Sequence, residues 1–241
     1  MPGRTGPAAA RPAAGGTLPA GWPGARRATP GSEVSPRRQN SPLRQAQAAA
    51  TRLRIIQAAH TEFEARGYEG TRIEDVAARA GVAVPTVYKA FANKRNLLTA
   101  AVTTAMTGGP DGPVDRQAWF QEQLDAPTAE QQLQLIARNA RRLNDRAAHL
   151  LELVRATAAR DSQIATLWHG INNERHARAR TSAQQLAAKT TLRTSVPEAA
   201  HTLWALTVPE LYTRHVKESG RSPDAYQRWL ADVLTAVLLA H

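Results

Sequence analysis

The amino-acid sequence predicts an all-α fold with a small N-terminal bundle, which contains a helix-turn-helix, and a larger helical C-terminal part. Apolar residues recur at helical spacing along most of the chain from Leu43 onward. After residue 110, no Val/Ile/Thr-rich run alternates in the way that a half-buried strand requires. Glycine and proline mark many of the expected helix ends. These three observations exclude a sheet-based fold and divide the chain into residues 1–42, 43–110 and 111–241.

Residues 1–42 form a tail rich in Pro, Gly, Ala and Arg, with only isolated apolar residues. Such a segment cannot bury enough apolar surface to offset its conformational entropy, so we predict that it is disordered. Its six Arg against one Glu give it a charge of +5 within the net +11 of the chain. The arginines could lie along DNA phosphates, or the segment could be a solvated tail, and its lack of periodicity favours the tail.

The first helix is expected from Leu43 to Gly67, with Arg52 and Arg54 outside its apolar stripe and free to contact solvent or phosphate. A second helix begins with a predicted capping box, in which Thr71 accepts from a backbone amide and Glu74 reaches back to Thr71. Gly81 ends it. The residues expected to face inward are Ala46, Ala49, Ala50, Leu53, Ile56, Ala59, His60 and Phe63 in the first helix, and Ile73, Val76, Ala77 and Ala80 in the second.

Only two residues separate Gly81 from a third helix, which carries Val87 and Phe91 inward. Pro85 lies in its first turn, where a missing N–H costs nothing. Two short helices joined by a glycine-containing turn form a helix-turn-helix, here at 72–91, whose second helix enters the major groove of DNA. A fourth helix, from Lys94 to about Met106, ends at a Gly/Pro-rich break near residue 110.

The run Ala-Gly-Val-Ala-Val-Pro-Thr-Val-Tyr-Lys-Ala-Phe (80–91), followed by Asn-Lys-Arg-Asn-Leu-Leu (93–98), resembles the tetracycline-repressor (TetR) family of transcriptional regulators. The resemblance implies a DNA-binding N-terminal domain and a helical C-terminal domain that dimerises through its last two helices. Family members usually carry Ser, Thr or Glu where Ala83 stands. The loss of that N-cap typically costs about 1 kcal/mol of helix-end stability.

The predicted DNA contacts follow from the recognition helix and from the resemblance. Thr86 can bind a base edge, and Lys89 can donate to guanine or to phosphate. The resemblance implies that Tyr88 and Lys94 bind phosphate, and Thr71 could do the same at the start of the second helix. The competing interpretations are a half-buried Tyr88, a solvated Lys89 and a Pro85 that only starts a helix. The DNA-binding candidates are Thr71, Val84, Pro85, Thr86, Tyr88, Lys89 and Lys94.

The C-terminal helices are expected near 115–124, 128–145, 147–160, 162–189, 197–218 and 223–240. Pro209 should kink or split the fifth of these. The last two carry the heaviest apolar load, so they must be covered by their own domain or by a second copy of the chain. The resemblance implies that they form the interface of a homodimer, which needs one self-complementary patch.

A ligand pocket is predicted in the same C-terminal part. His169, Asn172 or Asn173, and His176 share one face of the helix expected at 162–189, and polar anchors among apolar walls are typical of small-ligand sites. Four aromatic residues are candidate walls: Trp119, Phe120, Trp168 and Trp204. The alternative, which general experience favours, is a solvated polar face and ordinary core aromatics.

Other function classes are excluded by what the sequence lacks. The chain has no Cys, so a disulfide framework and a thiolate metal site are excluded, and only two of its seven His are close in sequence. It has no hydrolase, zinc-protease or nucleotide-binding motif, so neither an enzyme nor a cofactor is expected. No apolar run approaches the ~18–20 residues of a membrane span, and the N-terminus is no signal peptide. We therefore expect a cytoplasmic protein.

The function expected from these observations is that of a dimeric repressor. It would bind a palindromic operator in double-stranded DNA, with half-sites about 34–36 Å apart, and a small-molecule effector of unidentified structure would release it. The alternative is a helix-turn-helix protein without an effector, whose helical C-terminal part serves dimerisation or partner binding. A ligand-sized cavity among residues 128–189 would favour the first interpretation.

Overall fold

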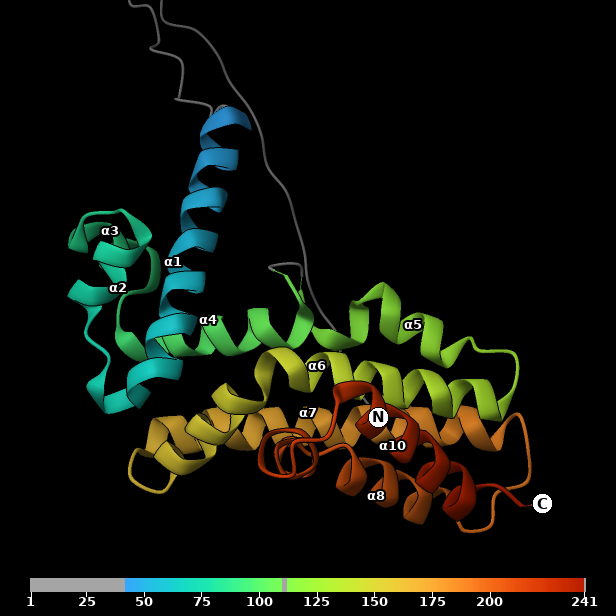
Figure 1. Ribbon diagram of the computed structural model, residues 1–241. Helices are drawn as coiled ribbons and strands as arrows, with labels where there is room; N and C mark the ends of the chain where they lie inside the picture. The colour runs from blue at the N-terminus through green and yellow to red at the C-terminus, as the bar shows by residue number, and fades with distance from the viewer. Residues whose placement is uncertain (1–41, 110–111, 241) are drawn as a thin grey trace, which may run out of the picture. The chain divides into compact units, whose positions relative to one another are not determined.

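The computed structural model describes residues 42–109 and 112–240, and in this part of the chain the secondary structure is helical apart from one isolated antiparallel bridge between Leu192 and Leu239 (Figure 1). The predicted tail lies outside the described residues except for Pro42. The helices are α1 (Pro42–Gly70), α2 (Ile73–Ala80), α3 (Val84–Phe91), α4 (Lys94–Thr107), the 3₁₀ turn η1 (Val114–Arg116), α5 (Ala118–Leu124), α6 (Ala129–Ala158), α7 (Ser162–Ala187), α8 (Val196–Leu206), α9 (Pro209–Tyr212), the π-helical turn η2 (Thr213–Glu218) and α10 (Pro223–Leu238).

The N-terminal helices pack as the sequence predicts. α1 contacts α2 and α4, and α3 contacts α2 and α4. Gly81 adopts a left-handed conformation (φ 64°) and ends α2, while Ala83 starts α3 without any side-chain cap. The predicted inward residues of both motif helices are buried: Ile73, Val76, Ala77, Ala80, Val87 and Phe91.

The apolar stripe of α1 begins later than predicted. Ala46, Ala49 and Ala50 are exposed, and continuous burial starts at Ile55. The first turns of α1 extend past α2 and α3 without a covering element among the described residues (Figure 1). Periodicity located the helix correctly. Burial also requires a neighbouring element, and alanines alone do not indicate one, because a small apolar side chain is common on exposed helix surfaces as well. At the other end, Gly67 interrupts α1 with φ 69°.

The predicted capping box at residue 71 is wrong. The N-cap of α2 is Arg72, which makes no side-chain cap hydrogen bond. The Thr71 hydroxyl instead donates to the carbonyl oxygens of Gly67 (2.7 Å) and Glu62 (3.0 Å) and is buried. The Thr71 hydroxyl thus connects the start of α2 to two carbonyls in the last turns of α1.

The predicted break near residue 146 is also wrong, since α6 is one 30-residue helix. No glycine or proline lies there, and the apolar stripe continues without interruption through Ala147, Leu150, Leu151 and Val154, which are all buried. The split ahead of Pro209 is confirmed: α8 ends at Leu206, and Pro209 begins α9.

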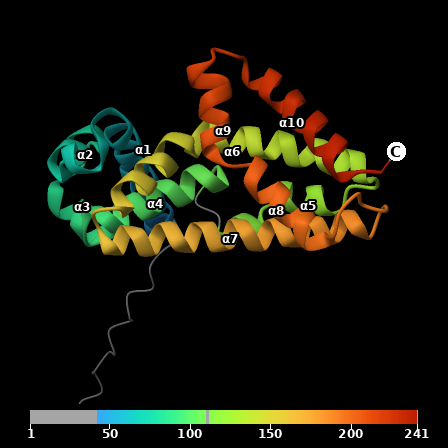
Figure 2. The same ribbon diagram turned by 90° about the horizontal axis from the view of Figure 1, so that it is seen from below.

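Two apolar cores hold this unit together. The first joins α1–α4 to the C-terminal half of α6 and the N-terminal half of α7, so the two predicted domains share a core across their boundary. The second lies between the other half of α6 and α7, α8 and α10 (Figure 2). Tyr212 and Tyr226 are fully buried in it and meet edge to face at 5.1 Å. The Tyr212 hydroxyl donates to the Asp145 carboxylate, and this ties α9 to α6.

The described helices provide neither a membrane span nor a cluster of metal ligands. None of the helices among residues 42–109 and 112–240 is long and apolar enough to cross a membrane. Within the same ranges, no group of three or more His, Asp or Glu side chains is placed to hold a metal ion.

Candidate DNA-binding surface and ligand cavity

The recognition helix α3 presents one exposed face. Pro85, Tyr88 and Lys89 are exposed, and the Tyr88 ring keeps 48% of its surface open to solvent. Val84 and Thr86 are partly exposed at the N-terminal end of the same helix, whereas Val87 and Phe91 are buried on the opposite face. Pro85, Thr86, Tyr88 and Lys89 therefore lie on the side that a DNA groove could reach, whereas Val84 packs partly against the first core at the edge of that side.

Arg52 of α1 holds the C-terminal end of α3. Its Nη1 donates to the Ala90 carbonyl oxygen at 2.7 Å, and its guanidinium lies 4.2 Å from the centre of the Phe91 ring. A cation near the last carbonyls of a helix is stabilising because it neutralises the negative end of the helix dipole. Arg52 thus has structural partners, contrary to the expectation that it is free, while Arg54 Nη2 donates to the Thr51 hydroxyl at 3.5 Å.

A tight turn at Ala92 connects α3 to α4. The Asn93 amide donates to the Phe91 carbonyl oxygen at 2.7 Å, which closes a three-residue γ-turn around Ala92 at φ 63° and ψ −43°. The Asn93 side chain then accepts from the Asn96 amide at 2.8 Å and caps α4. These two contacts fix where Lys94 begins α4 relative to the recognition helix.

Lys94 is partly committed to its own domain. Its ammonium donates to the carbonyl oxygens of Thr71 (3.1 Å) and Glu69 (3.4 Å) and lies 4.6 Å from the centre of the Tyr68 ring. Since a lysine has three N–H donors, one stays available for a phosphate. Thr71 differs from the other predicted contacts because its buried hydroxyl is already used twice.

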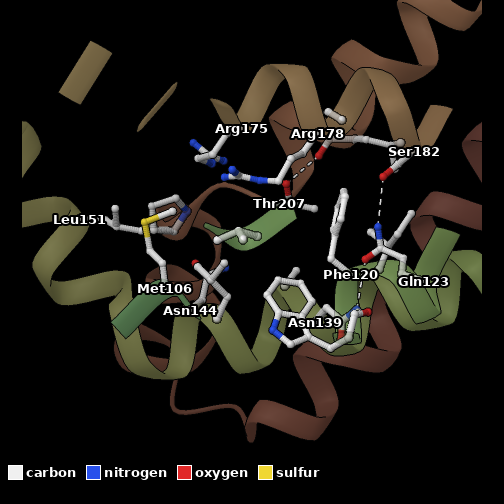
Figure 3. Close-up of a pocket in the computed structure, with 18 residues that line it drawn as sticks. Met106, Phe120, Gln123, Asn139, Asn144, Leu151, Arg175, Arg178, Ser182 and Thr207 are labelled. Atoms are coloured by element: carbon white, nitrogen blue, oxygen red, sulfur yellow. Dashed lines mark hydrogen bonds between the residues drawn. The ribbon is translucent and has the colours of Figure 1, made fainter. Parts of the chain in front are cut away.

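A cavity lies in the C-terminal part, between α5, α6, α7 and α8, and the end of α4 reaches it (Figure 3). Its volume is about 100 Å³, taken as the space open to the centres of water molecules. A single water needs roughly 10–15 Å³ on that measure, so the cavity is large enough for a small organic group. Most of the wall is apolar, with side chains that include Met106, Trp119, Phe120, Ile136, Leu151 and Leu203.

One polar side of the cavity is closed by hydrogen bonds within the protein. The Gln123 amide donates to the Ser182 hydroxyl at 3.1 Å, and Gln123 Oε1 accepts from Asn139 Nδ2 at 3.2 Å (Figure 3). Asn144, two residues before Arg146 on α6, is different. It is 2% exposed and lines the cavity, and neither its oxygen nor its nitrogen has a hydrogen-bond partner within 3.5 Å, although the Tyr226 hydroxyl is close enough for Asn144 to offset part of the increase that burial causes in the pKa of Tyr226.

Two arginines of α7, Arg175 and Arg178, lie one turn apart on the cavity wall opposite the α5 side chains (Figure 3). Burial lowers the pKa of both guanidinium groups, and the charge of Arg178 lowers the pKa of Arg175 further. Arg178 lies 3.5 Å from the Glu174 carboxylate. Arg175 donates only to neutral oxygens, Asn172 Oδ1 at 3.2 Å and the Trp204 carbonyl at 3.4 Å.

The structure separates the predicted ligand residues. Trp119 and Phe120 line the cavity, and the other candidates lie outside its wall. Trp168 packs against the first core, and His169 is exposed. Asn172 accepts from Arg175, and the His176 ring lies 5.7 Å from that of Trp204. The sequence analysis missed the residues of α7 that face the cavity. Counted from Ile171 at helical spacing, they are Arg175, Arg178, Ala179 and Ser182.

Helix α4 connects the two candidate sites. It begins at Lys94, directly after the turn that follows the recognition helix, and Met106 near its other end lines the cavity. Arg146 of α6 fixes that end, because it donates to the carbonyl oxygens of Ala105 (2.9 Å) and Met106 (3.3 Å). His60 of α1 donates in turn to the Arg146 carbonyl at 3.1 Å.

Comparison with known proteins agrees with this arrangement. Residues 55–101 match the model of the bacterial regulatory proteins of the tetR family. No curated protein matches the chain. Among solved structures, a protein from Mesorhizobium loti assigned as a TetR-family transcriptional regulator shares 24% identity over 80% of this chain and 99% of its own, with a TM-score of 0.58.

Two solved structures with similar folds contain small molecules. The transcriptional regulator FadR from Bacillus subtilis, in complex with stearoyl-CoA, is 18% identical over 76% of this chain and 96% of its own, with a TM-score of 0.60. A protein from Saccharomonospora viridis assigned as a transcriptional regulator, in complex with choline, is 20% identical over 80% and 99%, with a TM-score of 0.62. Residues 55–101 are thus similar to the bacterial regulatory proteins of the tetR family, and the chain shares its helical fold with these solved regulators.

Proposed function

We propose that this protein is a transcriptional repressor that binds a palindromic operator as a homodimer and is released from it by a small-molecule effector. The observation that carries the proposal is the placement of two sites on one helix. The exposed face of α3 adjoins the start of α4, and the cavity adjoins its end. A ligand can change DNA affinity only by as much as its own binding free energy differs between two arrangements of the protein. Helix α4 is the element that both sites contact.

The proposed DNA contacts are those of the exposed face of α3 and the start of α4. Thr86 and Lys89 are assigned to base edges, and Tyr88 and Lys94 to phosphates. Val84 and Pro85 are apolar, so they would contribute shape and contact with thymine methyl groups. The buried hydroxyl of Thr71 excludes its side chain from this set.

The proposed dimer forms through α8 and α10, the helices that the family resemblance implies. Their inward residues fill the second core, while Val237 on α10 keeps 46% of its surface exposed. A two-fold axis through the surface around Val237 would pair this surface with its own copy. It would also present two copies of α3 to successive major grooves.

Control by an effector is favoured over the alternative of a protein that only dimerises. The cavity wall contains the Asn144 amide, which makes no hydrogen bond within 3.5 Å, and two guanidinium groups, and such groups inside a mainly apolar wall are typical of a small-ligand site. The complexes of similar folds with stearoyl-CoA and choline support the same choice.

Fluorescence anisotropy with tiled duplexes from the chain's own upstream region, at two salt concentrations, tests DNA recognition. We expect one tile to bind at least tenfold more tightly than the rest. Lys89→Ala should weaken that binding roughly 5- to 100-fold, as expected for one specific contact. Lys217→Ala, which removes an exposed lysine of η2, is the matched control and should leave it unchanged. Equal and steeply salt-dependent binding of all tiles, unaffected by Lys89→Ala, would contradict the assignment.

A further inference from the structure

The charges around the cavity do not balance. Arg178 has a carboxylate partner in Glu174 at 3.5 Å, whereas Arg175 has no carboxylate within 4.0 Å among the described residues. Glu210, the acidic residue with the largest effect on Arg175, already pairs with Arg155 at 3.2 Å. Arg175 is therefore left without a carboxylate in direct contact, and Glu210 acts on it only from a distance.

The remaining wall supplies no compensation. None of the cavity-lining residues in the described part of the chain is Asp or Glu, and most are apolar. A buried cation without a partner is costly, because it has lost water and gained no opposite charge. The low pKa of Arg175, caused chiefly by burial, reflects the same imbalance.

The buried amide of Asn144 is a second observation. Asn144 is 2% exposed and lines the same cavity from α6, and the neighbouring Tyr226 hydroxyl makes no hydrogen bond with it within 3.5 Å. Its Nδ2 donates to an anion as readily as to a neutral oxygen. Two separate helices thus offer donors to one cavity, and the described wall offers no charged acceptor.

We propose that the effector is a small organic monocarboxylic acid with an apolar body, an inference that rests on the proposed function of the cavity as an effector site. Its carboxylate binds Arg175, with Arg178 beside it and Asn144 as a further donor. Its apolar part lies against Trp119, Phe120 and Leu151. A single negative charge matches the single uncompensated cation, and a guanidinium binds the two oxygens of a carboxylate in a fork. An organic cation would meet two like charges.

A path to this site is visible on the α5 side. Phe120 and Arg178 also line an outer hollow formed by η1, α5 and α7, so they separate the cavity from the surface. Glu174 lies in the wall of that hollow, where it pairs with Arg178. An acid that replaces Glu174 beside Arg178 could enter the cavity by this path. The Arg178 guanidinium would then keep a carboxylate partner throughout.

The test uses the full-length protein without DNA and three matched pairs of small probes that suit a cavity of about 100 Å³: propanoate with propanamide, butanoate with butanamide, and 2-methylpropanoate with its amide. Binding is measured by calorimetry and by the shift of the thermal unfolding midpoint. We expect at least one acid to bind tenfold or more tightly than its amide. Arg175→Met should abolish that preference and Asn144→Leu should weaken it, while Arg180→Met, an exposed arginine on the same helix, should retain it.

Three results would overturn the inference: acids and amides that bind equally, an unchanged acid affinity in Arg175→Met, or no binding by any of the acids. A ligand-free measurement guards against a variant that merely misfolds. Removing an uncompensated buried charge should raise the thermal midpoint of Arg175→Met, and a lower midpoint would show that Arg175 is a structural group. Release of the operator is measured separately, so an acid that binds without releasing DNA contradicts the proposed function and leaves the ligand class intact.

Discussion

Ala92 is the only residue other than glycine that has a positive φ among the described residues. It lies at the centre of the γ-turn between α3 and α4, in a conformation that L-residues with a Cβ rarely adopt. Such a position costs of order 1–3 kcal/mol and persists where the surroundings determine it. Here the surroundings are the buried Phe91 on one side and the Asn93 cap on the other.

Replacing Ala92 by glycine should stabilise the protein. Glycine relieves the strain, although it adds conformational freedom to the unfolded chain, so the expected net gain is about 1 kcal/mol in the free energy of unfolding. Urea denaturation measures it. Ala90→Gly, two residues earlier in the regular part of α3, is the control and should lose about 1 kcal/mol. A loss of stability in Ala92→Gly would mean that the turn is not strained.

Individual contact residues differ in how far the sequence can predict them. The exposure of Pro85, Tyr88 and Lys89 follows from helical periodicity, because the opposite positions are apolar. Thr71 could not be placed in that way. Its hydroxyl binds the carbonyls of Glu62 and Gly67 in α1, on the other side of the non-helical Gly67, and no local pattern distinguishes this arrangement from a capping box.

At the scale of single helices, α4 depends on a side chain from α6. The last carbonyls of a helix lack intrahelical donors. Arg146 donates to two of these carbonyls in α4, those of Ala105 and Met106. The next residues leave the helix at Gly108, whose Cα lies close beneath the Arg146 guanidinium: a Cβ built there would be 3.3 Å from Arg146 Cζ. Arg146 therefore determines where α4 stops and how its end meets the cavity.

Arg146→Ala should loosen the last turn of α4. Hydrogen bonds from a charged donor contribute about 1.5–3 kcal/mol, so we expect amide hydrogen exchange in residues 104–108 to be roughly tenfold faster or more. Mass spectrometry of peptides covering 100–109 measures the exchange. Arg142→Ala on the exposed face of the same helix is the control and should leave the rate unchanged. Equal exchange rates in both variants would show that α4 holds its end without Arg146.

The inward face of α7 illustrates where element-level prediction stops. The helix has polar residues on two faces, one with His169, Asn172 and His176 and one with Arg175 and Arg178. Periodicity alone cannot decide between two polar faces. The choice depends on α5 and α8, which place Phe120 and Leu203 against the arginine face, and that packing is a tertiary property.

For the molecule as a whole, the sequence predicted the helical fold, the motif helices and the split at Pro209, because these depend on local spacing, glycine and proline. It did not predict the continuity of α6 or the core that α6 and α7 share with α1–α4. That core depends on which helices meet. The basic charge of the N-terminal side agrees with the site that α3 presents, but charge alone does not identify a binding face.

Val237→Glu tests the proposed dimer. A charge placed at the centre of a self-complementary apolar patch faces its own copy across the two-fold axis, so we expect the wild-type dimer to become mainly monomeric at micromolar concentration. Light scattering coupled to size-exclusion chromatography gives the mass directly. Leu43→Glu changes the other strongly exposed aliphatic residue of the described chain, on α1, and should leave the dimer intact. A monomeric wild type would contradict the proposed assembly.

The length of α4 turns small changes at the cavity into large ones at the DNA. Its 14 residues span about 21 Å at 1.5 Å per residue. Treated as a rigid lever pivoting at Met106, the helix moves its Lys94 end by about 2 Å for a tilt of about 5° over that length. In a symmetric dimer both arms swing, so the separation of the recognition helices would change by up to about 4 Å, more than the few tenths of an ångström over which a hydrogen bond keeps its strength. In the proposed dimer, the spacing of the two recognition helices would thus depend on a helix whose far end lines the proposed effector cavity.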